Sequence, residues 1–229
     1  MKRMHIILCI LLCGYFLPLK AEDVNVNHYQ DSILKVSEAM PPTLVKLTYL
    51  RDMAYLHQYA PYNLTFSTRL YEEAICQKNT FYENMGAYYL AATYDKKHDA
   101  DSLYYWVNIL KKLVSEVGTY DYYLEQKAAI SRALASKGKI EKAIYVAKET
   151  LAEAQKYNSN NGTIAAYNSL GCAYGVSSRS KEALNVFLKA YKSFSPQTKT
   201  SLKVDILSRI AQVYGNAGYD SRVGKKIMV

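Results

Sequence analysis

The chain has 229 residues, half of them hydrophobic, with only 10 Gly and 5 Pro. This length suffices for a folded core, and the scarcity of Gly and Pro argues against a turn-rich β-sandwich. The formal net charge of +9 comes from Lys and Arg residues that alternate with Glu and Asp instead of forming one basic face, which argues against nucleic-acid binding.

Residues 1–21 have the composition of a secretory signal peptide. A basic start precedes an apolar stretch at residues 6–17, which is shorter than the roughly 20 residues of a membrane-spanning helix. We expect cleavage after Ala21, leaving a periplasmic or secreted chain whose formal net charge falls from +9 to +6. An uncleaved anchor and lipidation at Cys13 are the alternatives.

Residues 22–78 are expected to form an N-terminal helical segment. Three stretches have apolar residues three and four positions apart and are predicted to be amphipathic helices: 24–39, 42–59 and 63–77. Pro41 and Pro42 are expected to separate the first helix from the second, and Pro61 the second from the third. Proline is tolerated in the first turn of a helix, so Pro42 can lie within the second helix.

Residues 79–120 are predicted to form two helices joined by a polar turn at 96–99. Large residues surround small ones on both helices: Tyr82, Met85, Gly86 and Tyr89 on the first, then Ser102, Trp106 and Ile109 on the second. Tyr is abundant, at 23 of 229 residues, and its apolar ring with a polar tip suits half-buried seams between helices.

Residues 124–160 are predicted to form a second helix pair. Its marks are an apolar first helix, a glycine in the turn and a small residue on the second helix: Ile130, Leu134, Gly138 and Ala143. Glycine is favoured in such a turn because it adopts a left-handed backbone without strain.

The clearest pattern lies 40 residues further on, in residues 164–197. Seven positions carry it: Tyr167, Leu170, Gly171 and Tyr174 on a first helix, then Ala183, Phe187 and Ala190 on a second. Gly171 and Ala183 are small enough for the two helices to approach closely, and Tyr174 and Phe187 fill the space beside that contact. This pattern resembles the tetratricopeptide repeat (TPR), with Tyr167 in place of the usual Trp.

The resemblance implies an all-α fold, a right-handed superhelical solenoid of antiparallel helix pairs. The repeats would span 79–120, 124–160, 164–197 and an incomplete 204–229, and 22–78 could contain one divergent repeat. The period of about 40 residues exceeds the usual 34. The polar stretches 156–162 and 195–198 would account for the difference, through longer helices or longer loops.

The last repeat ends nine residues after Asp220, too few for a second helix and a polar cap. An uncapped end leaves an apolar face in water. We expect a truncated product, with a covering partner or self-association through this end as the alternatives.

No catalytic or nucleotide-binding motif is found, and no metal-ligand spacing. We therefore expect no enzymatic activity, no cofactor and no metal. Cys76 and Cys172 are expected to be small buried side chains, although a disulfide between them stays open.

By resemblance, the first helices of a TPR array line a concave groove that binds a protein or peptide ligand. The polar residues that map to this groove are Glu83, Glu125, Arg132, Asn168, Asp205 and Gln212. The leading hypothesis is an exported binding scaffold. The alternative is the extracytoplasmic sensory part of a bacterial two-component sensor or membrane-tethered regulator, because the layout is similar to the TPR-containing input regions of such proteins; a membrane link would then need a retained signal or a missing C-terminal span.

Overall fold

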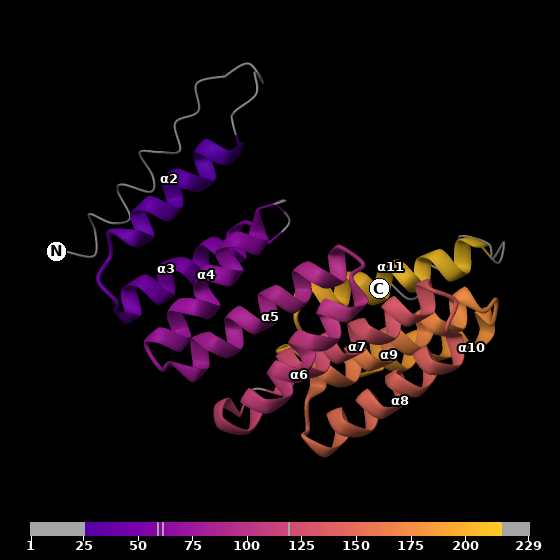
Figure 1. Cartoon of the computed structure of the whole chain (residues 1–229). Helices are drawn as coiled ribbons and strands as arrows, with labels where there is room; N and C mark the ends of the chain where they lie inside the picture. The colour runs from indigo at the N-terminus through magenta and orange to yellow at the C-terminus, as the bar shows by residue number, and fades with distance from the viewer. Residues whose placement is uncertain (1–25, 59, 61, 119, 217–229) are drawn as a thin grey trace. The chain divides into compact units, whose positions relative to one another are not determined.

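The computed structural model describes residues 26–58, 60, 62–118 and 120–216 (Figure 1). Within these residues the secondary structure is entirely helical. The helices are α2 (Val26–Glu38), α3 (Leu44–Leu56), α4 (Asn63–Cys76), α5 (Thr80–Lys96), α6 (Ala100–Val117), α7 (Tyr120–Ser136), α8 (Ile140–Lys156), α9 (Asn160–Val176), α10 (Ser180–Lys192) and α11 (Thr200–Asn216). The all-α prediction is confirmed, whereas the proposed signal peptide at 1–21 and the chain beyond residue 216 lie outside the described residues.

The chain divides into two compact units between Pro41 and Pro42. In the first unit, α2 is the described element. The second unit contains α3 to α11 and all of the candidate groove residues. The division falls at the tandem proline that the sequence marks as a helix break, because proline lacks the amide hydrogen that a continuing helix needs.

Helices from α5 onward begin at intervals of 20 residues, at Thr80, Ala100, Tyr120, Ile140, Asn160, Ser180 and Thr200. A residue with positive φ follows each helix from α4 to α9: Lys78, His98, Gly118, Gly138, Asn158 and Ser178. Because α10 is shorter than α5 to α9, a longer connection, residues 193–199, separates it from α11.

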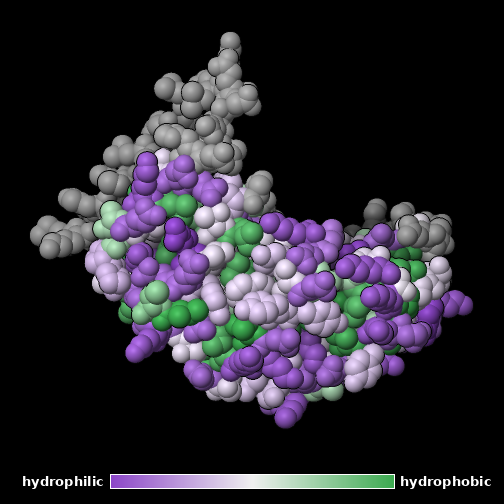
Figure 2. Space-filling model, in the orientation of Figure 1, coloured by the Kyte–Doolittle hydropathy of each residue, from purple (hydrophilic) through white to green (hydrophobic). Residues whose placement is uncertain are grey.

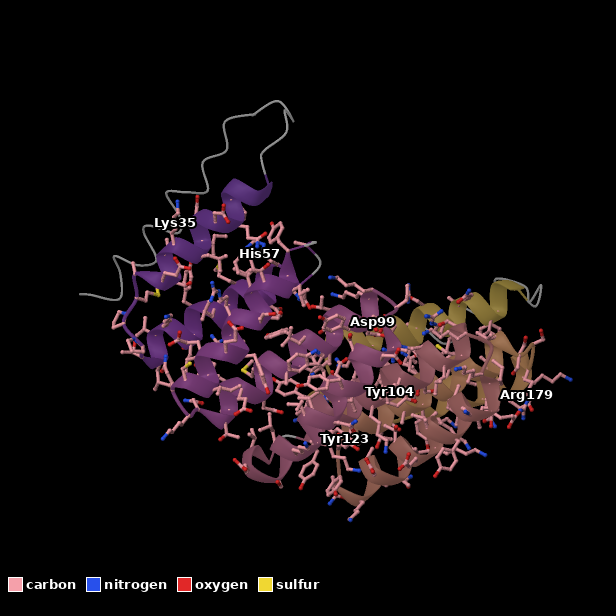
Figure 3. The ribbon with its side chains drawn as sticks, viewed as in Figure 1. Lys35, His57, Asp99, Tyr104, Tyr123 and Arg179 are labelled. Atoms are coloured by element: carbon pink, nitrogen blue, oxygen red, sulfur yellow. The ribbon has the colours of Figure 1, made fainter. Side chains whose placement is uncertain are left out.

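Most of these turns share one hydrogen-bonding pattern. The amide of the residue after the left-handed position donates to the carbonyl five residues earlier, as Asp99 does to Tyr94 at 3.1 Å and Ser159 to Ala154 at 2.9 Å. This is the Schellman arrangement, which satisfies the last carbonyls of a helix. Asp99, which is labelled in Figure 3, and Ser159 also accept a hydrogen bond from an amide of the following helix, so that one residue completes one helix and caps the next.

The two polar stretches expected to account for the longer repeat differ in structure. α8 runs to Lys156 and α9 begins at Asn160, so the polar stretch 156–162 is mostly helix. By contrast, α10 ends at Lys192 and the polar stretch 195–198 lies in a loop.

Every odd-numbered helix from α5 to α9 packs against both of the helices that follow it. Thus α7 contacts α8 and α9, and α9 contacts α10 and α11; α3 similarly contacts α4 and α5. Each even-numbered helix from α4 to α10 in turn packs on the next odd-numbered one. Odd-numbered helices are consequently neighbours of one another across the second unit. On the face shown in Figure 2, hydrophobic residues form separate patches among hydrophilic ones.

Small residues make the closest helix contacts. Gly171 of α9 faces the ring of Phe187 of α10, and a Cβ built on Gly171 would lie 2.4 Å from a ring carbon. Ala183 and Ala190 of α10 are fully buried in the same cluster. Gly86 of α5 also lies close to α4, where an added Cβ would be 2.8 Å from the Cα of Tyr71.

Candidate functional site

The six groove residues expected from the sequence have different surroundings in the structure. Asn168 is buried, with 4% of its surface exposed, and accepts a weak hydrogen bond from the Cys172 thiol at 3.8 Å. Asp205 and Gln212 are exposed on α11. Asn168 therefore packs within the unit, whereas the two α11 side chains are accessible to a ligand.

Arg132 of α7 is already engaged within the chain. Its guanidinium forms an ion pair with Asp95 of α5, with Nη2 and Oδ2 3.1 Å apart. Both side chains are about two-thirds buried. This pair bridges two successive odd-numbered helices, so Arg132 holds the array together at this point.

Glu125 of α7 is also engaged. Lys199 Nζ lies 2.6 Å from its Oε1, and the Tyr88 hydroxyl donates to its Oε2 at 3.4 Å. Burial raises the pKa of Glu125 above its ordinary value, while the charge of Lys199 acts in the opposite direction. Because Lys199 lies against this buried carboxylate, we regard the two as an ion pair.

Glu83 of α5 does not join these residues. It lies beside Glu116 of α6, and burial together with the Glu116 charge raises the pKa of its carboxyl. The starts of α5 and α7 are 40 residues apart, so Glu83 corresponds to Tyr123, whose hydroxyl points to Glu153 of α8 at 2.9 Å (Figure 3). The sequence register used for residues 79–120 was thus shifted relative to the later helix pairs.

Sequence reasoning missed three residues that contact the expected ones: Tyr88, Asp95 and Lys199. Alignment of the helix starts, at 80 and 120, would have placed Tyr88 and Asp95 on the same helix face as Ala128 and Ala135. Lys199 belongs to a loop and had no periodic signal.

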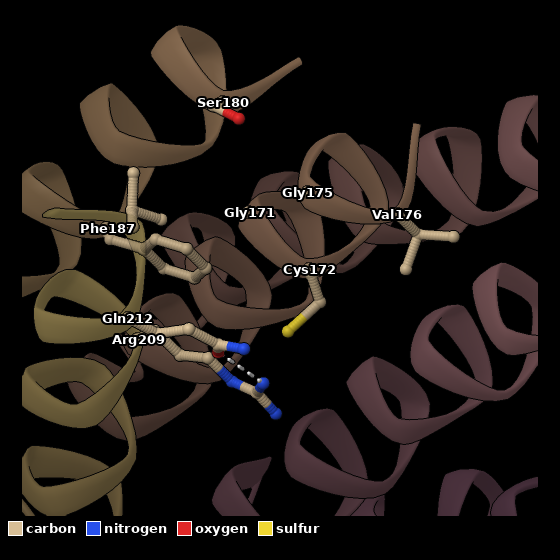
Figure 4. Close-up of a pocket in the computed structure, with 9 residues that line it drawn as sticks. Gly171, Cys172, Gly175, Val176, Ser180, Phe187, Arg209 and Gln212 are labelled. Carbon is tan, nitrogen blue, oxygen red and sulfur yellow. Dashed lines mark hydrogen bonds between the residues drawn. The ribbon is translucent and has the colours of Figure 1, made fainter. Parts of the chain in front are cut away.

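A cavity of about 280 Å³ opens between α9, α10 and α11 (Figure 4). Gly171, Cys172 and Gly175 of α9 form one wall, and Phe187 of α10 and Val213 of α11 supply apolar surface. A Cβ added to Gly175 would meet nothing within 4 Å, so this glycine leaves the cavity open.

The polar groups in this cavity are mainly donors. Arg209 and Gln212 come from α11, and Arg209 Nη1 donates to Gln212 Oε1 at 3.4 Å (Figure 4). Burial raises the pKa of the Cys172 thiol, which keeps it protonated at neutral pH. The site can therefore accept an apolar group together with a hydrogen-bond acceptor.

Comparison of the chain with protein-family models, curated proteins and solved structures gave no match. Among residues 26–216 that the structure describes, no group of three or more His, Cys, Asp and Glu side chains is placed to hold a metal ion. None of the described helices is long and apolar enough to cross a membrane. Cys76 and Cys172 are both free thiols, and the expectation that both are buried is wrong, because Cys76 is exposed and Cys172 is only partly buried.

Proposed function

We propose that this chain is an exported TPR-like scaffold that binds a protein or peptide along its odd-numbered helices and has no catalytic activity of its own. The packing of α5, α7, α9 and α11 on one another is the observation that supports this proposal. Adjacent first helices present one continuous surface, which is how helical repeat proteins bind extended ligands. The regular helix starts favour a superhelical solenoid with a period of about 40 residues.

The cavity at α9–α11 is the part of that surface best suited to a ligand side chain. Arg209 and Gln212 are exposed, and Phe187 provides an apolar floor. Pockets that combine apolar walls with a few polar groups are typical binding sites. Arg132 and Glu125 act in this proposal as supports for the surface, because each is held by an ion pair within the chain.

Affinity capture from envelope extract, followed by reconstitution with the purified captured protein, tests the proposal. Gly175→Met adds a long side chain at the cavity wall, where an added Cβ would meet nothing within 4 Å, and Arg209→Glu reverses the charge at its rim. Tyr145→Glu on α8 is the matched control, because Tyr145 is 68% exposed and does not line the cavity.

We expect the partner to bind the unmodified chain and the Tyr145 variant at least tenfold more tightly than the two cavity variants. Circular dichroism would establish that all variants keep the helical fold. Equal affinity of the partner for all four proteins would mean that it binds elsewhere, and would refute the assignment of the cavity as its binding site.

The proposed extracytoplasmic location depends on residues 1–21. Mass spectrometry of the chain recovered from a bacterial periplasm would test it. A mature form beginning at Glu22 supports export and cleavage, and a full-length chain confined to the cytoplasm contradicts them.

A further inference from the structure

A lysine from a distant part of the chain lies in a cage formed by two tyrosines and a carboxylate. Lys199, just before α11, places its Nζ 4.9 Å from the ring centroid of Tyr122 and 5.5 Å from that of Tyr88. The same nitrogen lies 2.6 Å from Glu125 Oε1. The two rings are adjacent, with centroids 4.6 Å apart. We call Tyr88, Tyr122 and Glu125 the ammonium site.

These three groups have the chemistry that recognises an organic cation. Aromatic faces attract ammonium groups through the ring quadrupole, and a desolvated carboxylate adds a full charge. The Glu125 side chain is 11% exposed, and its other oxygen accepts from Tyr88. One carboxylate oxygen is thereby left for the cation.

The ammonium of Lys199 can leave without moving its backbone. The Lys199 amide donates to Asn161 Oδ1 at 3.1 Å, and Asn160 Nδ2 donates to Thr198 Oγ1 at 3.1 Å. These bonds fix the loop independently of the side chain. The Lys199 side chain is 33% exposed, so the site opens to solvent, and its four-carbon stem is flexible.

Two buried amide side chains on α5 and α7, the helices that carry the ammonium site, have polar atoms without a hydrogen-bond partner among the described residues. Asn84 precedes Tyr88 by four residues on α5, and Gln126 follows Tyr122 by four on α7, so each shares a helix face with a cage tyrosine. Both side chains are buried, and Asn84 Oδ1 and Nδ2 and Gln126 Oε1 have no hydrogen-bond partner among the described residues. Buried polar atoms without partners are uncommon in folded proteins.

We infer that Tyr88, Tyr122 and Glu125 form a binding site for a primary ammonium group of a partner polypeptide, and that Lys199 occupies this site within the chain until the partner's group replaces it. The inference rests on the proposed scaffold function and specifies the chemistry of the ligand. Its test uses small ammonium compounds alone, so failure of the ammonium site and failure of the proposed cavity can be told apart.

Lys199→Met empties the site while keeping most of the alkyl stem. Thermal unfolding of this variant would be followed in methylammonium chloride and in sodium chloride at equal ionic strength. We expect methylammonium alone to raise the midpoint, by roughly 3–6 °C for each tenfold increase above its dissociation constant. Identical responses to the two salts would overturn the inference.

Lys46→Met is the matched control. Lys46 lies 2.7 Å from Glu73 Oε2, and no cation–ring contact of the described residues involves it. This variant also loses an ammonium from a carboxylate but has no aromatic cage, so methylammonium should not restore it. Equal restoration of both variants would show a general ion effect and refute the site.

A second measurement uses the unmodified chain and does not depend on the folding of a variant. The ε-methylene protons of Lys199 should show a ring-current shift in a nuclear magnetic resonance spectrum. Titration with N-acetyl-lysine amide, a lysine side-chain probe, or with glycine amide, an amino-terminus probe, should move that signal toward its free value. The probe that acts at lower concentration identifies the source of the ammonium, and no movement with either would overturn the inference.

Discussion

Three glycines in the helices of the second unit differ sharply in what an added methyl group would meet. Gly175 of α9 has open space, Gly171 one turn earlier faces the Phe187 ring at 2.4 Å, and Gly86 of α5 faces the Tyr71 backbone at 2.8 Å. Replacement of each by alanine therefore measures how closely the helices approach. All three sit within helices, so each change carries a propensity gain, which is smaller for Gly175 because it is the second-last residue of α9.

The magnitudes follow from two opposing effects. Alanine stabilises a helix interior by about 1 kcal/mol relative to glycine. Overpacking of a tight contact costs about 1–3 kcal/mol. Gly175→Ala should therefore be stabilising by up to about 1 kcal/mol, and Gly171→Ala should be less stable than Gly175→Ala by about 1–3 kcal/mol.

Gly86→Ala should be the most destabilising of the three. The Phe187 ring at Gly171 can rotate aside, but relief at Gly86 requires movement of the α4 backbone. Interiors are close-packed, so such a movement disturbs every contact of that helix.

Urea unfolding followed by circular dichroism at 222 nm gives these differences as shifts of the midpoint at constant slope. The comparison between Gly171→Ala and Gly175→Ala is the decisive one, because both changes lie in α9. If the two variants are equally stable, α9 and α10 do not approach as closely as the structure has them, and the reasoning from Gly171 and Phe187 fails.

Three further changes test other features of the fold, each by denaturant unfolding. Ser178→Gly should stabilise the chain by about 1 kcal/mol because it relieves a left-handed backbone at φ 61°, whereas Gly138→Ala, at φ 73°, should destabilise it by a similar amount; equal effects of both would contradict the turn assignment. Lys127→Ala should cost roughly 1–3 kcal/mol, less than a fully buried pair, because the buried ammonium bridges Glu149 and Glu153 of α8, which stay partly exposed; no loss would mean that these ion pairs do not form. Burial alone would raise the pKa of Glu73, but hydrogen bonds from Lys46 and Gln77 hold it below its ordinary value of 4.5. The contribution of Glu73 to the free energy of unfolding is therefore complete above pH 4.5 and is lost as the pH falls through the lowered pKa. Glu73→Gln should flatten the acid side of the curve of stability against pH, and an unchanged curve would refute the lowered pKa.

The helical character of the chain could be predicted from the sequence because apolar spacing reports which side of a helix is buried. The contact of Gly171 with Phe187 was foreseen for the same reason, since a small residue opposite a large one in adjacent helices allows close approach. The left-handed backbone at Gly138 also followed from its residue type. These are local properties, and local patterns encode them.

The candidate site was less predictable. Arg132 and Glu125 were expected to face a ligand, but Asp95 and Lys199 neutralise them within the chain. Those pairings join residues 37 and 74 positions apart, and depend on where helices and a loop meet in space. The spacing of apolar residues in a single sequence carries no information about such long-range contacts.

The register of α5 failed for a different physical reason. Glu83 was assigned to the groove by matching Tyr82 and Gly86 to a signature, yet Gly86 packs against α4 rather than against the helix that follows. A small residue signals close approach without naming the neighbour. Helix starts, which are set by turn geometry, are the more reliable reference for comparing one pair with the next.

The short turns between helices limit which insertions and deletions this chain can tolerate. Where a single residue ends one helix and caps the next, no flexible linker can accommodate an inserted or deleted residue. One extra residue inside a helix would rotate all later residues of that helix by about 100° and shift them by about 1.5 Å. The side chains after the insertion would then no longer face the helices against which they pack. Lengthening or shortening by whole helix pairs preserves those seams, so viable size variants should differ by multiples of forty residues.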